Sequence, residues 1–400
     1  MAEKKHHKRK LRVDRLLLVI GIVCILIALP ILTLRSCSTP ISKNDPSPKP
    51  STLPTLEAEP TSSPTPSNHV SLFFAGDTVI HESVYKDAQK EDGSFDFCHQ
   101  LDAIGDIAEP FDLAYYNQET ILGGTALGLS GFPTFNSPQE FGSYMVSRGF
   151  NLVSTATNHS LDMGMKGIQA SRDFWNKQSN VITDGTNTSP EQQNSIAHMT
   201  VNGVSIALVS YTFSTNNIEP EQPWEVNTYL GHVDEMLAKV KKAQEQYDCV
   251  IAAMHWGTEY DKEVNQEQLD LSQRLADAGA NIIIGNHPHV IQPFKWINGS
   301  TPCFYAMGNL ISTQTETENL IGMIGALDIV KKEDGSVEIQ NVRADLTYTL
   351  MDGEYPDLRT NIRTVPFAQL TEKELPEKDK LYQEYKNIIT SLDSNITLGL

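Results

Sequence analysis

The sequence predicts an α/β domain with a largely parallel central sheet, preceded by a membrane anchor and a linker. Beyond residue 70, short β-rich apolar runs alternate with amphipathic helical stretches. Residues 16–34 form an uncharged apolar run, and proline, serine and threonine dominate the residues between these two regions. The 400 residues are 40% apolar and 20% charged, which excludes a collagenous, coiled-coil or wholly disordered chain.

The N-terminal residues have the pattern of a single membrane anchor. The run at 16–34 (LLLVIGIVCILIALPILTL) spans roughly the 30 Å of a hydrocarbon core at about 1.5 Å per helical residue. Seven Lys and Arg residues lie in the tail at 1–15, and the positive-inside rule places such a tail in the cytoplasm. We therefore expect a single-pass protein of the cell membrane, with a cytoplasmic N-terminus and an extracellular domain.

A cleaved signal peptide and a lipoprotein signal ending at Cys37 are the competing interpretations. The apolar run is longer than the typical signal core of about 7 to 15 residues, and no clean A-x-A site follows it. Arg35 also lies close before the lipidation cysteine. These features favour an uncleaved anchor, followed by a disordered Pro/Ser/Thr-rich linker over residues 35–69.

Seven apolar runs are expected to be strands of the domain. They are Val70–Ala75, Asp112–Tyr116, Asn151–Ala156, Ser205–Ser210, Cys249–Met254, Asn281–Ile284 and Cys303–Ala306. Helices are expected at Val233–Gln246 and Gln266–Ala278. The region 321–350 predicts a hairpin that turns at Asp334-Gly335, and Pro376–Leu392 predicts a charged helix within a C-terminal extension, 351–400.

Five of these strands are followed at once by side chains that can bind metal. They lead into Asp77, Asn117-Gln118-Glu119, Asn158-His159, His255, and His287 with His289. The carboxyl ends of strands line the ligand crevice of open α/β sheets, so these residues are expected to converge. Eight of the eleven histidines lie beyond residue 70, and four of those eight closely follow predicted strands.

The mixture of imidazole, carboxylate and amide ligands suits Mn, Fe or Zn, whereas calcium prefers oxygen ligands. The candidate ligands exceed what one tetrahedral site needs, so two adjacent divalent ions are expected. These ligands are Asp77, Glu119, Asn158, His255, His287 and His289. With Glu119 as a bridge, such ions would lower the pKa of a shared water and clamp an oxyanion, which favours hydrolysis.

Each motif alone also has a structural explanation. Gly76-Asp77 is typical of a turn or helix cap, His159 fits a loop capped by Ser160, and His255 fits a packed corner beside Trp256. Independent structural causes would not all place polar residues at strand ends. The joint pattern therefore favours the metal site.

Seven motifs occur in the order AGDTVIHESVY, YYNQET, FPTFNSP, TATNHSLDMG, HWGTEY, GNHPHVIQP and FYAMGNLI, over about residues 70–312. Together they resemble the CapA family of poly-γ-glutamate capsule biosynthesis proteins, a branch of the calcineurin-like metallophosphoesterases. The resemblance implies a four-layer, metallophosphoesterase-like α/β sandwich over residues 70–350. It also implies a metal centre at the strand ends.

Carried over residue by residue, the resemblance makes Asp77 a ligand of the first motif and Asn158 an amide ligand. Glu119 takes the place of a bridging aspartate. His255, His287 and His289 complete two metal shells. The resemblance then implies that His159 donates a proton to the leaving group, a role that histidine can take because it titrates near neutral pH.

Two departures from the superfamily weigh against ordinary phosphoesterase activity. One is the change of the bridging aspartate to Glu119. The other is Val79, which replaces the histidine of the usual Asp-x-His motif, while His81 lies four residues after Asp77. His81 replaces the missing ligand if residues 78–84 begin a helix, and otherwise contacts substrate or a ligand.

Two asparagines are further candidates for substrate contact. Asn117 lies in the YYNQET motif, two residues before Glu119. Asn136, with Ser137, either lines the pocket or forms a turn before a helix at Pro138.

Three functions fit these features. The first is an anchored extracytoplasmic hydrolase or transferase acting on an amide or phosphoester bond of a capsule or envelope polymer. The second is a non-catalytic subunit that binds or exports poly-γ-glutamate within a membrane synthase complex. The third is a metal-dependent phosphatase with an unrelated substrate.

The net charge limits the classes of binding partner, and the cysteine spacing limits the kinds of structural site. Residues 70–400 hold 21 basic and 45 acidic side chains, a net charge of −24. A nucleic-acid surface is therefore not expected. An anionic polymer could bind only where metal ions or a local basic patch make the electrostatic potential positive. The five cysteines are far apart in sequence, which argues against disulfide scaffolding and Cys-ligated zinc.

Overall fold

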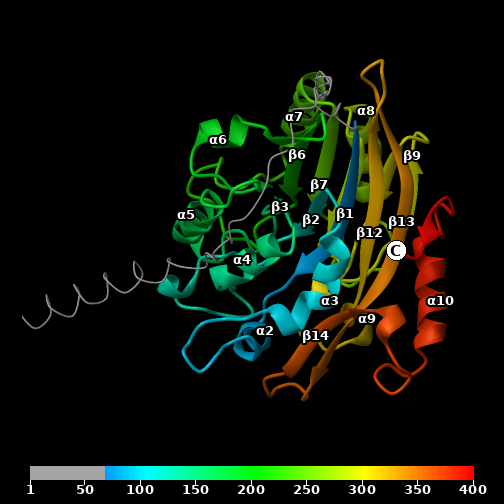
Figure 1. Ribbon diagram of the computed structural model, residues 1–400. Helices are drawn as coiled ribbons and strands as arrows, with labels where there is room; N and C mark the ends of the chain where they lie inside the picture. Colours follow the sequence, from blue (N-terminus) through cyan, green and yellow to red (C-terminus); the bar gives the residue numbers. More distant parts are fainter. Residues whose placement is uncertain (1–67) are drawn as a thin grey trace, which may run out of the picture. The chain divides into compact units, whose positions relative to one another are not determined.

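The computed structural model describes residues 68–400, which form two β-sheets packed face to face with helices on their outer faces. The first sheet has nine strands and the second has six. Figure 1 shows the long strands β12 and β13 of the first sheet beside β1.

The first sheet is mixed. β1 runs parallel to β2, which is followed by parallel β3 and β4, whereas β12 to β14 are antiparallel additions on the other side of β1. β11 and β15 pair with β1 and β13, off the main path. In spatial order the main path is β14 (Thr360–Pro366), β13 (Val337–Asp352), β12 (Ile321–Lys331), β1 (His69–Thr78), β2 (Leu113–Asn117), β3 (Leu152–Ser154) and β4 (Ile182–Asp184), with β11 at Asn309–Ile311 and β15 at Thr397–Leu398.

The second sheet has a parallel centre, β6 to β8 followed by β10, and antiparallel edges, β5 and β9. Its order is β5 (Ala197–Val201), β6 (Val204–Thr212), β7 (Cys249–His255), β8 (Ile282–Asn286), β10 (Thr301–Phe304) and β9 (Phe294–Ile297). Parallel strands place their carboxyl ends at one edge, and this edge carries the candidate site.

Alternation along the strands divides the core into layers. Leu72 and Phe74 of β1 face the second sheet, where the Phe74 ring lies 4.7 Å from that of Phe304. Phe73 and Ala75 face outward and pack under helices instead. This period of two is what a strand buried on both faces requires.

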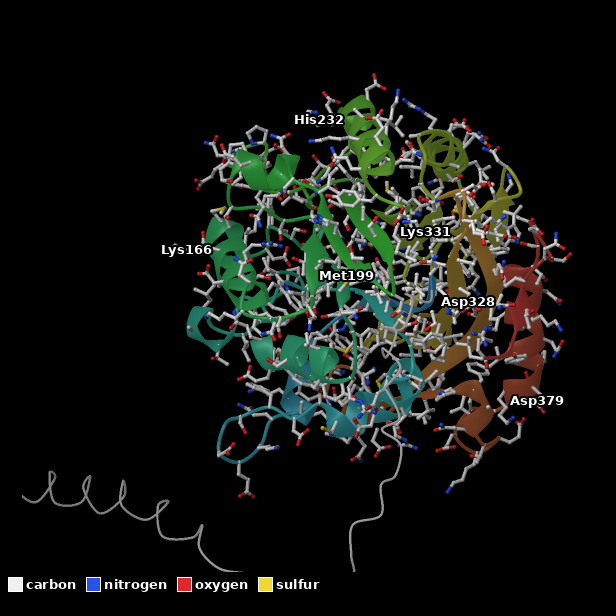
Figure 2. The ribbon with its side chains drawn as sticks, turned by 45° about the horizontal axis from the view of Figure 1, so that its top comes forward. Lys166, Met199, His232, Asp328, Lys331 and Asp379 are labelled. Carbon is white, nitrogen blue, oxygen red and sulfur yellow. The ribbon has the colours of Figure 1, made fainter. Side chains whose placement is uncertain are left out.

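Helices cover both outer faces. Those over the first sheet are α2 (Glu82–Asp87), α3 (Cys98–Ala108), α4 (Gln139–Ser147) and α5 (Gly164–Trp175), and those over the second are α7 (Val233–Gln246) and α8 (Gln266–Asp277). The remaining helices are α6 (Pro190–Asn194), α9 (Thr317–Leu320) and α10 (Lys378–Ile389). Polar side chains such as Lys166, His232 and Asp379 are exposed on this outer layer (Figure 2).

The layered α/β arrangement is as expected, but the single, largely parallel central sheet is wrong. Two mixed sheets are present instead. Buried strands of either sheet read as similar apolar runs, so the sequence pattern cannot assign a strand to one sheet or the other.

All seven expected strands are present, with ends shifted by at most three residues. The helix at Val233–Gln246 has its predicted bounds, and the hairpin turns at Asp334-Gly335 with Gly335 at φ 85°. A helix over residues 78–84, the condition for His81 to replace the missing ligand, is absent, because β1 continues to Thr78 and α2 begins only after His81.

The C-terminal residues, 351–400, contribute to the same sheet and core. β14 and β15 pair with β13. Tyr385 and Ile389 of α10 are buried in the core cluster that also contains strand residues of both sheets. α10 begins at Lys378, so Pro376 precedes the helix instead of lying in its first turn.

The expected anchor at 16–34 lies outside the described residues, as does nearly all of the linker. No helix among residues 68–400 combines the length and apolarity that a bilayer crossing requires.

Candidate metal centre

The candidate ligands meet at the carboxyl ends of strands from both sheets. Asp77 lies in β1, Glu119 follows β2 by two residues, and His255 ends β7. Asn158 follows β3, while His287 and His289 follow β8. All six side chains are buried, so residues remote in sequence form one enclosed polar cluster.

Two glycines let these strands approach closely. A Cβ at Gly76, just before Asp77, would lie 2.0 Å from the Gly308 carbonyl oxygen. A Cβ at Gly285 would lie 1.9 Å from the Tyr305 carbonyl oxygen. Both distances are far below van der Waals contact, so close backbone packing explains these two glycines of the motifs.

The loop after β8 holds its histidines in a backbone conformation that is rare for residues other than glycine. His287 has φ 99° and His289 has φ 58°, and such strain costs of order 1–3 kcal/mol per residue. The His287 N–H donates to Asp77 Oδ2 at 3.0 Å, and the Tyr260 N–H donates to the Pro288 carbonyl at 2.7 Å. The first bond holds the strained loop against Asp77, and the second joins it to Tyr260.

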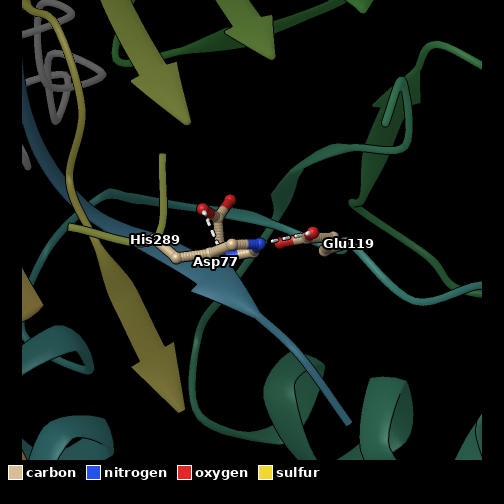
Figure 3. A group of neighbouring side chains, drawn as sticks. All are labelled: Asp77, Glu119 and His289. Atoms are coloured by element: carbon tan, nitrogen blue, oxygen red, sulfur yellow. Dashed lines mark ion pairs between the residues drawn. The ribbon is translucent and has the colours of Figure 1, made fainter. Parts of the chain in front are cut away.

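Asp77, Glu119 and His289 form the first ligand group (Figure 3). Their donor atoms lie within 4.8 Å of one another. His289 Nε2 lies 3.4 Å from Glu119 Oε1, and His289 Nδ1 lies 3.8 Å from Asp77 Oδ2. This spacing suits three ligands around one cation.

Asn309 fixes the tautomer of His289. The Asn309 amide nitrogen donates to Gln314 Oε1 at 2.8 Å and to the Asn319 carbonyl at 2.9 Å, so its Oδ1 accepts from His289 Nδ1 at 2.9 Å. Nδ1 therefore carries the proton, and the lone pair of Nε2 points toward Glu119. Metal-binding histidines are commonly oriented in this way.

Glu119, Asn158, His255 and His287 form a second buried cluster of candidate ligands, which we call the second ligand group. His255 Nε2 lies 2.9 Å from Asn158 Oδ1 and 4.0 Å from Glu119 Oε1. The rings of His255 and His287 have centroids 4.8 Å apart. Glu119 thus lies between the two groups.

Several atoms of this cluster lack partners among residues 68–400. Both carboxylate oxygens of Glu119, at 1% exposure, have no hydrogen bond, and neither does His287 Nδ1. An unpaired buried carboxylate is costly, whereas a bound cation would satisfy it. Nitrogen and oxygen donors in this mixture fit a divalent transition metal, so the residues present suit a metal ion.

Burial governs the protonation of the cluster. It raises the pKa of Asp77 to about 7 and raises the pKa of Glu119 well above its usual value, with Asp77 adding repulsion. It lowers the pKa of His287 to about 3, that of His289 to about 4 and that of His255 well below 6.5. The histidines are neutral at pH 7, so the 3.4 Å contact of His289 with Glu119 is no salt bridge.

His159 forms a dyad with Asp162 beside the second ligand group. Its Nδ1 lies 2.7 Å from Asp162 Oδ2, which also accepts from the Phe135 N–H at 2.6 Å. Asn216 lies between the dyad and the ligands, 3.5 Å from His159 Nε2 and 3.2 Å from Asn158 Nδ2. His159 is therefore oriented with Nε2 on the side of the ligands.

Asn117 and His81 differ in their relation to the ligands. Asn117 donates to Asp77 Oδ1 at 2.7 Å and lies 3.3 Å from His255 Nδ1, so it contacts one member of each ligand group. His81 Nδ1 lies 3.1 Å from the Val79 carbonyl and 3.3 Å from the Thr313 nitrogen. His81 precedes α2 and is not part of the first ligand group.

Asn136 stabilises a loop. Its amide nitrogen donates to the carbonyls of Gly124 and Gly128, and the neighbouring Ser137 hydroxyl donates to Thr120 Oγ1. These contacts match the turn alternative for Asn136 instead of a pocket lining.

A cavity of about 540 Å³ adjoins the first ligand group. Tyr260 and Asn319 lie between them: both line the cavity, the Tyr260 ring lies 5.9 Å from that of His289, and Asn319 donates to the His289 carbonyl. His81 also lines the cavity, and its pKa falls to about 4 through burial and the nearby His289.

Three contributors were not predicted from the sequence: Asp162, Asn216 and Asn309. Asp162 lies three residues after His159, within the same motif, and that spacing is a usable signal. Asn309 follows the predicted strand at Cys303–Ala306, as the ligands follow theirs. Asn216 follows β6 in a loop without any motif, and no pattern marks it.

Comparison with known proteins gives a consistent family match. A family model described as bacterial capsule synthesis protein PGA_cap matches residues 71–314, a range that includes both ligand groups. The chain is 28% identical over 190 residues to PGA biosynthesis protein CapA of Bacillus subtilis (strain 168), covering 48% of this chain and 50% of that protein. It is 32% identical over 173 residues to capsule biosynthesis protein CapA of Bacillus anthracis, covering 42% and 41%.

The chain spans about half the length of these curated relatives or less. Among solved structures it is similar to Haemophilus influenzae NAD nucleotidase (NadN), with a TM-score of 0.43, 12% identity, and coverage of 83% of this chain and 64% of that one. It is also similar to the 5'-nucleotidase precursor of Thermus thermophilus, with a TM-score of 0.41, 13% identity, and coverage of 70% and 54%.

Proposed function

Because the chain belongs to the PGA_cap family of bacterial capsule synthesis proteins, we propose that it is a metal-dependent hydrolase or transferase of a capsule or cell-envelope polymer, poly-γ-glutamate being the first candidate. The observation that carries the proposal is the buried Glu119. Neither of its oxygens has a hydrogen bond within residues 68–400, and Oε1 lies near both His255 and His289. We assign the domain to the metallophosphoesterase-like fold, because it has two facing sheets and its candidate ligands lie at strand ends.

The two ligand groups account for two divalent ions, Mn, Fe or Zn. Asp77, Glu119 and His289 would hold one ion, and Glu119, Asn158, His255 and His287 would hold the other. When bound, such ions supply Lewis acidity that activates water and stabilises negative charge on an oxyanion. Asn117 keeps Asp77 in place through its 2.7 Å hydrogen bond.

His159 is the group that moves a proton. Because Asp162 holds its Nδ1, the Nε2 atom donates a proton to the leaving group on the side of the ligands. Asp162 also stabilises the positive charge of the ring before the transfer. A positioned acid of this kind contributes about 10²- to 10⁴-fold to a rate.

We further propose that the domain acts outside the cell, anchored by the apolar run at 16–34, where envelope polymers and synthase or export subunits of the membrane are accessible. The net charge of −24 over residues 70–400 opposes general binding of a polyanion. This favours chemistry at one local site over a polymer-binding surface.

The test is turnover by the purified full-length chain, loaded in turn with Mn²⁺, Fe²⁺ and Zn²⁺. Substrates are a γ-glutamyl polymer and a set of phosphoesters, with Asp77→Asn and His287→Ala as site variants. We expect metal-dependent cleavage of one substrate class that both variants lose. Tight polymer binding without turnover would instead support a non-catalytic subunit, and the absence of both metal and ligand binding would end the proposal.

A further inference from the structure

The cavity beside the first ligand group contains a buried arginine whose guanidinium has no partner among the described residues. Arg359 lines this cavity at 8% exposure, and its guanidinium makes no ion pair or hydrogen bond with any of residues 68–400. Its backbone N–H donates to Ser83 Oγ at 3.0 Å, which fixes the loop before β14 to α2. A guanidinium without such partners has five N–H donors available, which makes it a strong site for an oxyanion.

The carboxylates of the same cavity do not supply that partner. Glu82, Glu316, Glu318 and Asp357 all line it, yet none of them forms an ion pair with the guanidinium. Glu318 is paired instead with Lys262 at 2.7 Å. The remaining acidic side chains make the cavity unfavourable for an extended polyanion lying along its whole length.

The other walls are apolar and exposed. Phe132 is 78% exposed and Tyr355 is 76% exposed, and Leu358 adds a third apolar side chain. The Phe132 ring lies 6.4 Å from that of Phe135, whose ring lies 4.7 Å from His159. The apolar wall therefore leads from the cavity toward the proposed proton donor.

We propose that Arg359 binds the terminal carboxylate of a γ-glutamyl chain, whose methylene groups pack against Phe132 and Tyr355, so that the site selects a chain end over an internal segment. A chain end can present its terminal unit to Arg359 while the next units leave the acidic cavity, whereas an internal segment would place charged units on both sides. This proposal rests on the proposed function, since it names the substrate of that same centre.

The experiment measures binding by calorimetry, with the full-length chain and a γ-glutamyl oligomer of about five units. We expect Arg359→Gln to weaken binding at least tenfold, whereas Arg363→Gln leaves it unchanged. Arg363 is the matched control, because it lies on β14 but pairs with Glu374 outside the cavity. An oligomer amidated at its terminal carboxylate should bind the native chain as weakly as the free oligomer binds the Arg359→Gln chain.

Two more variants keep the test decisive if Arg359→Gln does not fold. Arg359→Lys keeps the charge but loses the planar fork, so it should also weaken binding. Tyr355→Ala removes an exposed side chain and should weaken binding without lowering the melting temperature.

Three outcomes would overturn the proposal: equal affinity for native and Arg359 variants, unchanged affinity after amidation, or dependence on Arg359 for a phosphoester such as glycerol phosphate but not for the oligomer. The calorimetric measurement of binding does not depend on turnover. A chain that binds the oligomer through Arg359 but cleaves nothing would therefore refute the proposed hydrolase activity and support the proposed Arg359 site.

Discussion

Glu119 and Asp184 are two buried carboxylates near strand ends of the same sheet, and they differ in what surrounds them. Asp184 ends β4, where Oδ2 accepts from the Ser210 N–H at 2.7 Å and Oδ1 lies 3.3 Å from Lys239 Nζ. Glu119 follows β2, and neither of its oxygens has a hydrogen bond within residues 68–400.

This difference indicates a structural role for Asp184 and a functional role for Glu119. A buried charge that is paired and hydrogen-bonded stabilises one arrangement of the chain, as Asp184 does in joining β4, β6 and α7. A buried carboxylate left without partners among the described residues, beside neutral histidines, is tolerated if a proton neutralises it or a bound cation supplies positive charge. The contrast therefore predicts opposite effects for substitutions at the two positions.

The largest effect is expected for Glu119→Gln. Because Glu119 belongs to both ligand groups, the variant should lose metal-dependent turnover and bind metal more than about 100-fold more weakly, beyond the roughly 10–100-fold typical of residues behind the ligands. The melting temperature of the metal-free chain should stay the same where Glu119 is protonated and rise where it is ionised, since glutamine carries no charge. Calorimetric titration and thermal unfolding in chelator measure both effects, and a large loss of metal-free stability would contradict them.

Asp184→Ala should give the reverse pattern. Removing one partner of a buried pair leaves Lys239 uncompensated, so the free energy of unfolding should fall by about 3–5 kcal/mol, while metal affinity is retained. Asp379→Ala, an exposed position on α10, is the control and should change little. If Asp184→Ala removed metal binding from a chain that is still folded, the division between the two carboxylates would fail.

Asp162→Asn sharpens the comparison, because Asp162 is buried and hydrogen-bonded but contacts the proposed proton donor. We expect turnover to fall by about 10- to 100-fold with metal content unchanged, short of the roughly 10²- to 10⁴-fold that a general acid contributes. His159→Ala sets the upper limit of that loss. Steady-state rates and elemental analysis on the same samples would show whether the dyad acts apart from the metal.

The smallest effect is a pH dependence. Burial raises the pKa of Asp77 from 3.8 to about 7 and that of Glu119 well above its usual value, so the metal-free fold holds protons that the unfolded chain releases. This contribution to stability is lost as pH rises from about 4 toward about 7. Metal must displace those protons, while His287 and His289, with pKa values of about 3 and about 4, are already neutral.

The rise in melting temperature on adding Mn²⁺ should therefore be larger at about pH 8 than at about pH 5.5. Glu119→Gln should show little of this difference. If the metal-induced rise in melting temperature were larger at low pH, the expected direction of the pH dependence would be wrong.

The sequence predicts the strands and their polar ends because buried strands and turn residues leave local patterns. Asp77, Glu119 and His289 were accordingly identifiable before the fold was known. The division into two sheets depends instead on pairings between distant segments, such as β1 with β12, which leave no local pattern. Asn216 and the partners of Asp184 belong to this second kind, since their roles exist only once three elements meet.

The role of His81 shows the same limit. Its spacing from Asp77 suggested a shared helix face, but β1 continues through Thr78, and pairing with Ile311 of β11 sets that end. The long-range pairing outweighs the local pattern, and His81 lines the cavity instead.

The central claim is that Glu119 lies between two cation sites. Anomalous diffraction from crystals of the chain grown with Mn²⁺ tests it most directly. We predict two peaks, one beside Asp77 and His289 and one beside His255 and His287, with Glu119 in contact with both. Crystals with Mn²⁺ bound elsewhere, and no anomalous peak beside Glu119, would contradict the claim.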